Sequence, residues 1–589
     1  MNQFLKFVLA SCLGVTLAIG AIFGILILVG ISAGSSSQKS VDVKPNTVLE
    51  LNFDQNIPEL TNNTKRDPFA FEEDIVGLQD MVRTIKKAES DKNIKGILIK
   101  PESVGRGIAT SAVLRDALKE FKNSGKFIIA YSKWYSQGDY YMASVADEVY
   151  LHPMGSVDFR GFVAVVPFFK EAMDKIGVKY DVFYAGDFKS ATEPFRRNDM
   201  SPQNKLQLRE FLEEMNGLFL AEIGTSRNIP VATLESISSH TIIQNAEMAK
   251  RIRFIDKIGY RDEVLADLRD RLGMEEDEDI KSISLDDYFA SVKDDTDFNT
   301  KDKVAVVYAE GEIVDGKGEE GQVADEKYVK IIEKLRTDDK VKAIVLRVNS
   351  PGGSAMASEN IWRELTLARD QGIKVVVSMG DYAASGGYYI SCASDSIFAE
   401  AESLTGSIGV FNMFPDVSEL MNDKLGISFD TVKTGEYSAG FNPVLGLSDK
   451  EGEFMQNFVD EMYETFLKRV SEARGMTRDE AHAVAQGRIW SGNRALELGL
   501  VDKIGGLDDA LSSAAGLAGL EKYRIVTYPK PKDPLQSLIE EIMGQESNTI
   551  STRVIEKELG EYATYYKMAR SLKEQEGIQF RMPFEVEFR

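Results

Sequence analysis

Ile94-Lys95-Gly96-Ile97-Leu98-Ile99-Lys100 recurs 247 residues later (94 to 341) as Val341-Lys342-Ala343-Ile344-Val345-Leu346-Arg347. Two more stretches recur at almost the same offset: Lys126–Tyr141 as Lys374–Tyr389, and Asp181–Pro194 as Asp430–Pro443. The offset drifts slowly along the chain, as single-residue insertions would make it do. A repeat of this length indicates a duplicated domain rather than a solenoid.

The two copies differ at complementary positions. Ser385 of the second copy aligns with Gln137 of the first, and Lys189 of the first copy aligns with Ser438 of the second. If both positions face one cleft, the two copies together supply one serine and one lysine.

Each copy alternates β-branched runs with helical periods. In the second copy this pattern predicts strands at 343–348, 375–379 and 396–399, and helices at 357–370, 385–393 and 455–473. Such alternation is typical of right-handed βαβ crossovers in a layered α/β fold. We therefore expect two tandem α/β domains.

The expected organisation has six parts. They are a transmembrane anchor (1–34), a linker (35–46), a first repeat (47–272), an acidic connection (273–303), a second repeat (304–515) and a C-terminal appendage (516–589) with helical stretches at 535–543 and 554–574.

The N-terminal segment sets the expected location. From Phe7 to Ser32 the 26 residues carry no charge, and about 20 suffice to span a bilayer. Lys6 precedes the segment, so we expect the N-terminus inside and the body outside the cytoplasm. A cleaved signal segment and a buried soluble helix are the alternatives.

Composition excludes other classes of function. A net charge of −23 argues against nucleic acid as a partner, because a phosphate backbone needs a basic surface. The only two cysteines, Cys12 and Cys392, exclude a disulfide framework, since Cys12 lies in the apolar N-terminal segment. The sequence contains no nucleotide-binding P-loop motif and no His-Glu-x-x-His zinc motif.

A glycine pair marks the first candidate site element. Asn349–Ser354 (Asn-Ser-Pro-Gly-Gly-Ser) follows an apolar strand and precedes a helix. Its glycines allow a tight turn that leaves backbone N–H groups exposed, as an oxyanion requires. An ordinary strand-to-helix turn is the alternative.

Ser385 is the candidate nucleophile. It lies between small residues at the start of a predicted helix, and the N–H of Gly386 can supply an oxyanion donor. A simple N-cap role is the alternative.

The serine needs a base. The three histidines, His152, His240 and His482, lie outside the repeated and glycine-rich motifs, so each is interpreted as structural. A lysine serves as base when burial lowers its pKa, and Lys189 is the candidate.

These residues resemble the long, two-repeat form of the bacterial signal peptide peptidase A family, a group of membrane-anchored Ser/Lys proteases. Four stretches carry the resemblance: Gly186–Pro202, Asn349–Ser354, Ala384–Ser391 and Leu404–Phe411. The resemblance implies a fold similar to the Clp protease and crotonase superfamily, with two such domains in tandem behind the anchor.

The resemblance also implies the roles of single residues. The nucleophile is expected at Ser385, the general base at Lys189, the oxyanion donors at the N–H groups of Gly353 and Gly386, and the hydroxyl that orients the lysine at Ser407. It implies no metal or cofactor. The expected assembly is a homotetramer in the bacterial inner membrane that faces the periplasm. The expected substrates are remnant signal peptides and other unfolded, apolar peptides.

Two other functions remain open from the residues. A crotonase-like acyl-thioester enzyme also uses paired backbone donors, and a non-catalytic scaffold could dock membrane partners through its C-terminal appendage.

Overall fold

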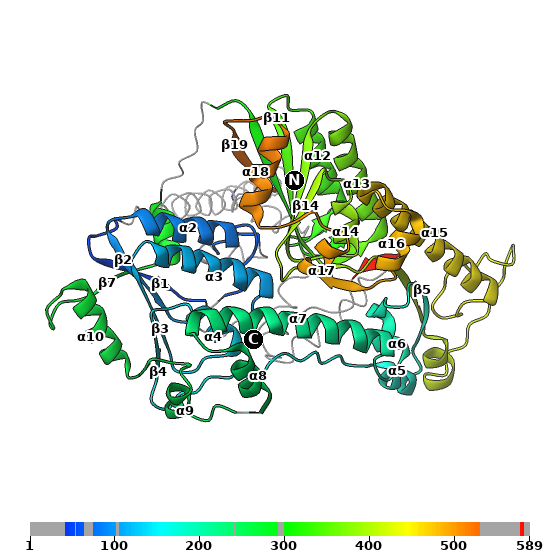
Figure 1. The fold of residues 1–589 in the computed structure, drawn as a ribbon. Coiled ribbons are helices and arrows are strands. Elements are labelled where there is room, and N and C mark those ends of the chain that lie inside the picture. Colours follow the sequence, from blue (N-terminus) through cyan, green and yellow to red (C-terminus); the bar gives the residue numbers. More distant parts are fainter. Residues whose placement is uncertain are drawn as a thin grey trace, which may run out of the picture.

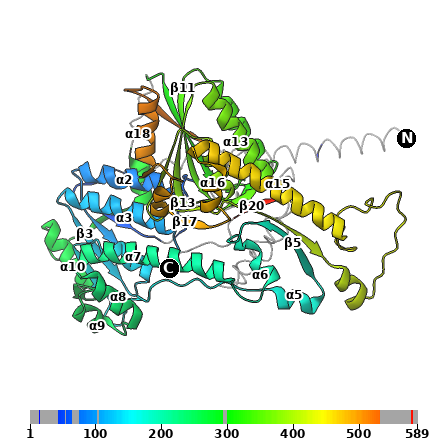
Figure 2. The ribbon, with the colours of Figure 1, turned by 45° about the vertical axis from the view of Figure 1, so that its right-hand side comes forward.

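The computed structural model describes residues 14, 42–53, 55–63, 75–101, 105–240, 242–292, 300–530 and 578–581. Two parallel sheets form the centres of two halves that lie side by side (Figure 1). The long helix α7 (Pro202–Arg227) runs along both halves in the two views and contacts the second through β17 (Ile489–Ser491) (Figures 1 and 2).

The first half is built on a parallel sheet of order β6-β4-β3-β2-β1-β7. Its strands are β1 (Thr47–Leu51), β2 (Ile94–Ile99), β3 (Phe127–Ser132), β4 (Glu148–Leu151), β6 (Lys257–Ile258) and β7 (Lys281–Ser284). Its other helices are α2 (Leu78–Ser90), α3 (Ile108–Asn123), α4 (Gln137–Ala143), α8 (Val231–His240), α9 (Ala246–Arg251), α10 (Arg261–Leu272) and α11 (Leu285–Ser291).

The second half repeats this order as β18-β14-β13-β11-β8-β19, again parallel, which confirms the duplication. Its strands are β8 (Lys303–Glu310), β11 (Val341–Ser350), β13 (Lys374–Ala384), β14 (Ser396–Ala399), β18 (Lys503–Ile504) and β19 (Arg524–Tyr528), with β15 (Leu404–Gly406) and β17 added at the end of β13. Its helices are α12 (Asp325–Arg336), α13 (Ala355–Asp370), α14 (Gly386–Ser391), α15 (Asp449–Arg474), α16 (Arg478–Val484), α17 (Gly492–Glu497) and α18 (Leu507–Leu517).

The elements predicted in the second copy are confirmed in type and order. The central parallel strands read largely as apolar runs because helices cover both faces of the sheet; in β11, Ala343 to Leu346 are all buried. One boundary matters for function. Strand β13 continues past the predicted end at 379 to Ala384, so it delivers Ser385 directly to the turn before α14.

The acidic connection expected at 273–303 is shorter than predicted. Strand β7 pairs in parallel with β1, and α11 follows it. Both add buried side chains to the first core, namely Ile283, Leu285 and Tyr288. The acidic residues between these positions conceal the apolar pattern. In the second half β19 also lies beyond the expected boundary at 515 and pairs with β8.

The expected anchor (except Gly14), the start of the linker and the helical stretches at 535–543 and 554–574 lie outside the described residues. Within the part of the chain that the structure describes, no helix is both long enough and apolar enough to span a bilayer.

A third sheet, of order β10-β9-β12-β20-β16-β5, joins the two halves. Its strands are β5 (Lys179–Ala185), β9 (Ile313–Val314), β10 (Val323–Ala324), β12 (Gly352–Ser354), β16 (Val410–Asp416) and β20 (Gln579–Arg581). Strand β5 of the first copy pairs antiparallel with β16 of the second over the whole length of both. Helices α5 (Lys170–Ile176) and α6 (Glu193–Arg196) flank β5, and the pair extends to one side as an arm (Figure 2).

Buried polar contacts also fix the two halves together. The Arg347 guanidinium on β11 donates to both carboxylate oxygens of Glu59 at 2.9 Å, and the two side chains are 1% and 2% exposed. Nearby, the Asp381 carboxylate on β13 accepts from the N–H (2.9 Å) and the hydroxyl (2.6 Å) of Thr110, in the first turn of α3. A displacement between the halves would therefore break charge-assisted hydrogen bonds away from water.

Replacing Arg347 with methionine should destabilise the protein by about 3–5 kcal/mol, because it leaves the Glu59 carboxylate buried without its cation. The double variant Arg347→Met with Glu59→Gln should lose less, since no buried charge remains unpaired. Urea unfolding followed by tryptophan fluorescence measures both.

The matched control is Lys330→Ala, which removes an exposed ion pair with Glu326 (3.8 Å) and should cost about 0–1 kcal/mol. Equal midpoints for Arg347→Met and Lys330→Ala would contradict the interpretation of the buried pair.

Candidate active site

The structure brings together three of the residues singled out in the sequence. The Lys189 amine (Nζ) lies 2.8 Å from the Ser385 hydroxyl (Oγ), 3.0 Å from the Ser407 carbonyl oxygen and 3.2 Å from the Ser407 hydroxyl. All three residues are buried, with at most 1% of the surface exposed. The lysine comes from the first copy and both serines come from the second.

Ser385 occupies a strained turn between β13 and α14. Its φ is +53° and its ψ −110°, a conformation that non-glycine residues rarely adopt and that is found most often at functional sites. The residue stands at the N-cap position of α14, yet its side chain makes no capping hydrogen bond. The hydroxyl instead lies 2.8 Å from the Lys189 amine, within hydrogen-bond distance. Capping therefore does not explain this serine.

Burial sets the electrostatics of the site. It lowers the pKa of the Lys189 amine well below its usual range, because desolvation penalises the ammonium form. A neutral amine has two N–H groups and one lone pair. Two contacts to Ser407 satisfy the N–H groups, and the lone pair is then left to accept the Ser385 proton.

Ser407 is held in its place by the backbone. Its φ is +50°, and its N–H donates to the Arg488 carbonyl at 2.7 Å. In the same region the Ser385 N–H donates to the Gly406 carbonyl at 2.8 Å. The positions of Ser385 and Ser407 are therefore tied to each other, because Ser385 is bonded to Gly406, the residue next to Ser407.

A loop of the second copy, residues 485–488, clamps the lysine segment and was not predicted from the sequence. The Phe188 N–H donates to the Gln486 carbonyl at 2.9 Å, and the Gly487 N–H donates to the Ile408 carbonyl at 2.7 Å. Gly487 has a φ of +77°, and a Cβ there would lie 2.7 Å from the backbone of Lys189. Only glycine fits this position.

Gln207 on α7 is a second contributor that was not predicted. Its side-chain amide donates to the Phe188 carbonyl at 3.1 Å and to the Ser190 hydroxyl at 3.0 Å, and its carbonyl accepts from the Ile489 N–H at 3.3 Å. It thus bridges both sides of the clamp. Its only signal in the sequence is its place just beyond the Gly186–Pro202 motif.

The two glycines expected as oxyanion donors lie near this group. Gly386 is the first residue of α14, so its N–H has no acceptor within the helix. A Cβ on Gly386 would lie 3.2 Å from the Gly352 Cα, which places the glycine loop against the start of α14. Gly353 lies in β12, aligned with Ile313 of β9 on one side and Phe580 of β20 on the other.

The counterparts of these residues lie elsewhere. Gln137 is buried in the first half, where its side chain accepts from the Gly161 N–H at 2.9 Å. Ser438 is exposed. None of the histidines approaches Ser385: His152 accepts from the Met154 N–H (3.1 Å), His240 contacts the Ser236 carbonyl (3.3 Å) and His482 contacts the Tyr463 hydroxyl (2.9 Å).

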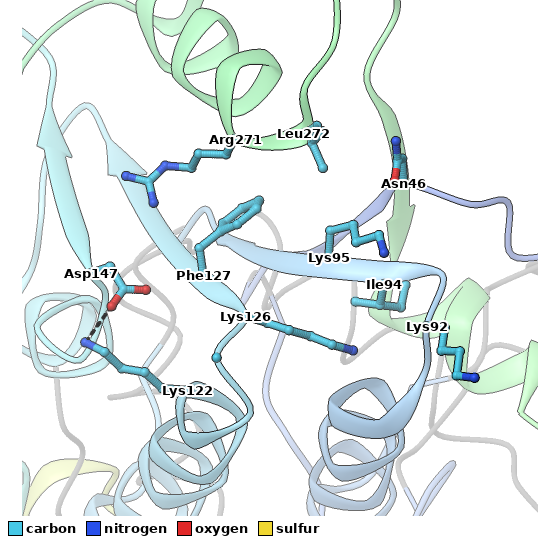
Figure 3. A pocket seen from close by; sticks show the side chains of 11 residues that line it. Asn46, Lys92, Ile94, Lys95, Lys122, Lys126, Phe127, Asp147, Arg271 and Leu272 are labelled. Carbon is cyan, nitrogen blue, oxygen red and sulfur yellow. Dashed lines mark ion pairs between the residues drawn. The ribbon is translucent and has the colours of Figure 1, made fainter.

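A cavity of about 920 Å³ lies at the N-terminal end of the first sheet and contains none of the site residues. Five cations line it: Lys92, Lys95, Lys122, Lys126 and Arg271 (Figure 3). The fold uses at least two of these charges. Lys122 pairs with Asp147 (2.9 Å), and Lys126 donates to the Ala88 and Asp91 carbonyls (2.6 Å each). In the described ranges no group of three or more His, Cys, Asp or Glu side chains could hold a metal ion.

A buried lysine amine bonded to a serine hydroxyl on a strained turn is the arrangement expected of a serine hydrolase that uses lysine as its base. Comparison with known proteins is consistent with this class. The chain matches the model of Peptidase family S49 at residues 120–275 and 367–521, once in each half. The chain belongs to this family and is a serine protease.

Three relatives with the names of proteases are similar to this chain over most of its length. Protease 4 of Haemophilus influenzae is 35% identical over 513 residues, which cover 84% of this chain and 83% of the relative. Protease 4 of Salmonella typhi is 36% identical over 480 residues (79% and 76%). The chloroplastic serine protease SPPA of Arabidopsis thaliana is 29% identical over 518 residues (86% and 74%). Family membership favours a protease over the acyl-thioester enzyme and the scaffold.

Among solved structures, a mutant of ClpP1 from Listeria monocytogenes matches with 18% sequence identity and a TM-score of 0.24, covering 35% of this chain and 94% of that chain.

Gly487→Ala should reduce peptide hydrolysis at least tenfold, because a Cβ there forces the Lys189 backbone away from Ser385 and misplacement by about 1 Å can cost 100-fold. The matched control is Gly475→Ala, which has a similar φ of +64° but no atom within 4 Å of the added Cβ. Steady-state hydrolysis of a fluorogenic peptide measures both. Full activity in Gly487→Ala would contradict the clamp.

Proposed function

We propose that the protein is a membrane-anchored endopeptidase in which Lys189 and Ser385 form a catalytic dyad. It would degrade cleaved signal peptides and other unfolded, apolar peptides. The hydrogen bond of 2.8 Å between a fully buried amine and the serine hydroxyl is the observation that carries the proposal. In this assignment the first repeat supplies the base and the second supplies the nucleophile.

The reaction begins with neutral Lys189, which takes the proton from the Ser385 hydroxyl as the oxygen attacks a peptide carbonyl. The N–H groups of Gly353 and Gly386 stabilise the oxyanion. The Lys189 ammonium then returns its proton to the leaving amine, and an acyl-enzyme remains. Water, deprotonated by Lys189, hydrolyses the ester, and Ser407 holds the amine in position through both steps.

The place of strand β20 supports unfolded substrates. Strand β20 of the chain itself lies between β12 and β16, in an antiparallel arrangement with both. A peptide bound in this way adds a strand to a sheet through its main-chain groups. Such binding requires an extended backbone, which a folded protein does not offer.

An apolar surface supports the expected homotetramer. Large hydrophobic side chains are exposed on the arm around β16 and the start of α15: Leu425, Ile427, Phe429, Val432, Phe441, Phe454 and Phe458. Contiguous exposed apolar residues mark interaction sites. We assign the protein to the bacterial inner membrane, anchored by residues 1–34 with its body in the periplasm, and each half to the Clp protease/crotonase-like fold.

Ser385→Ala and Lys189→Met should each lower kcat/KM by about 100-fold to 10,000-fold or more, the range for loss of general base catalysis. Ser407→Ala should lower it less, since the Ser407 carbonyl still contacts the amine. Ser438→Ala, the exposed counterpart of Lys189, is the control and should keep full activity. Hydrolysis of apolar fluorogenic peptides by chains lacking residues 1–45 measures all four. Peptide hydrolysis that persists in Lys189→Met would contradict the assignment of Lys189 as the general base.

The pH dependence follows from the state of Lys189. Its pKa is lowered by burial, and only the neutral amine accepts the serine proton. The value of kcat/KM should therefore rise with pH through the folded pKa, below the ordinary lysine value of about 10.4, and fall as pH drops beneath it. A profile from pH 6 to 10 tests this. A flat profile in the chemical step is the contradicting result.

The buried Lys189 should also lower the free energy of unfolding at neutral pH. The unfolded chain takes up a proton on this lysine below about pH 10.4 while the folded chain takes it up only below the lowered pKa. Wild-type stability thus falls as pH drops from about 10.4 to the folded pKa. Lys189→Met removes this linkage, so its unfolding midpoint relative to wild type should be higher at about pH 7 than at about pH 10.5. A difference that does not change with pH would refute the lowered pKa.

A further inference from the structure

Strand β20 occupies a slot beside the proposed nucleophile. Gly352, Gly353 and Ser354 of β12 align with Arg581, Phe580 and Gln579, and Gln579 also aligns with Phe411 of β16. The Ala355 N–H donates to the Ile578 carbonyl at 3.1 Å. The slot thus lies between the glycine loop and the strand that begins one residue after Gly409, whose carbonyl oxygen is 3.5 Å from the Ser385 hydroxyl.

The slot has an acidic side chain where Arg581 lies. The Arg581 guanidinium (Nη1) is 2.7 Å from the Glu312 carboxylate (Oε1), and the two side chains are 18% and 16% exposed. Ion pairs in such partly desolvated positions exceed exposed pairs in strength and discriminate by charge.

The backbone fixes Glu312 relative to the slot. Its carbonyl accepts from the Val323 N–H at 2.8 Å, and the next residue, Ile313, pairs with Gly353 of β12. A Cβ on Gly353 would lie only 2.0 Å from the Ile313 carbonyl oxygen. The Glu312 backbone therefore has a constant place relative to β12.

We propose that Glu312 is a specificity-determining residue that selects a lysine or arginine side chain in the bound peptide, at the position that Arg581 takes. The inference rests on the proposed endopeptidase function and adds a charge preference to it. The ion pair also sets the register, because a shift of one residue turns the basic side chain to the opposite face of the strand. A peptide with a basic residue next to an apolar run offers Glu312 the basic side chain that it selects. Signal peptides have this pattern.

The same contact makes residues 578–581 an intramolecular competitor of substrate. The chain presents its own basic residue to Glu312, so a substrate strand must displace β20 before it reaches Ser385. A substrate with a matching lysine or arginine replaces the ion pair that it breaks, whereas a neutral or acidic substrate does not.

The test compares three apolar peptides that differ only at the basic position, with Arg, Gln or Glu, across full-length wild type, Glu312→Gln and Glu312→Arg. Wild type should cleave the Arg peptide about tenfold better than the Gln peptide in kcat/KM, the effect of one such pair (a factor of ten is about 1.4 kcal/mol). Glu312→Gln should lose this preference, and Glu312→Arg should favour the Glu peptide. Equal preference in wild type and Glu312→Gln would overturn the proposal.

Two further variants complete the test. Glu319→Gln, an exposed residue of the same loop, should keep the wild-type preference. Arg581→Gln should lower the KM of all three peptides without changing their order. An unchanged KM would show that β20 does not hold the slot in solution and would also overturn the proposal.

Failure of the proposed function gives a different pattern. If wild type cleaves none of the peptides and a serine-directed phosphonate probe does not label Ser385, the endopeptidase assignment falls and the inference falls with it. If labelling and cleavage occur without charge preference, only the role of Glu312 is refuted.

Discussion

The antiparallel pairing of β5 with β16 is the constraint on which the site depends. Lys189 follows β5 in the first copy, and Ser385 belongs to the second. The pairing joins Lys179–Ala185 to Val410–Asp416 residue by residue, so it carries the lysine segment out of its own half and sets it against the Ser407 turn. The clamp at 485–488 and Gln207 then hold only a segment that this pairing has already delivered.

Burial of Lys189 at this junction determines the protonation state of its amine. An ammonium group cut off from water without a carboxylate partner is costly, and the group lowers its pKa instead. The contacts with Ser407 and Ser385 satisfy a neutral amine but give no counter-charge. The strained backbone at Ser385 and Ser407 is a further cost at the same place. Both costs are offset elsewhere, through the parallel sheets and buried contacts such as Arg347 with Glu59.

The sequence predicts the two halves and the two principal site residues, but not the contacts that join the halves. The repeat predicts two similar halves, and its mismatched positions point to Lys189 and Ser385, because a repeated motif exposes what one copy has lost. The sequence does not predict the third sheet, since the pairing of β5 with β16 joins segments more than 200 residues apart (185 to 410). Nothing in the sequence of either segment indicates which strand it pairs with. Gly487 is not predicted for the same reason, because it lies in the second copy and meets the Lys189 backbone across the junction. Gln207 belongs to the first copy, and no pattern in the sequence indicates its contacts with Phe188, Ser190 and Ile489. Strand β7 and α11 were hidden by the acidic residues around their few apolar positions.

The central claim is that Lys189 is neutral in the folded protein while it contacts Ser385. Titration of the Lys189 side chain by NMR, with ¹³C-labelled lysine and Lys189→Met to assign the resonance, measures this directly. We expect a resonance that titrates well below the ordinary lysine pKa of about 10.4 and that disappears in the variant. A Lys189 resonance that titrates at or above about 10.4 in the folded protein would contradict the claim, because a protonated amine cannot take the proton of Ser385.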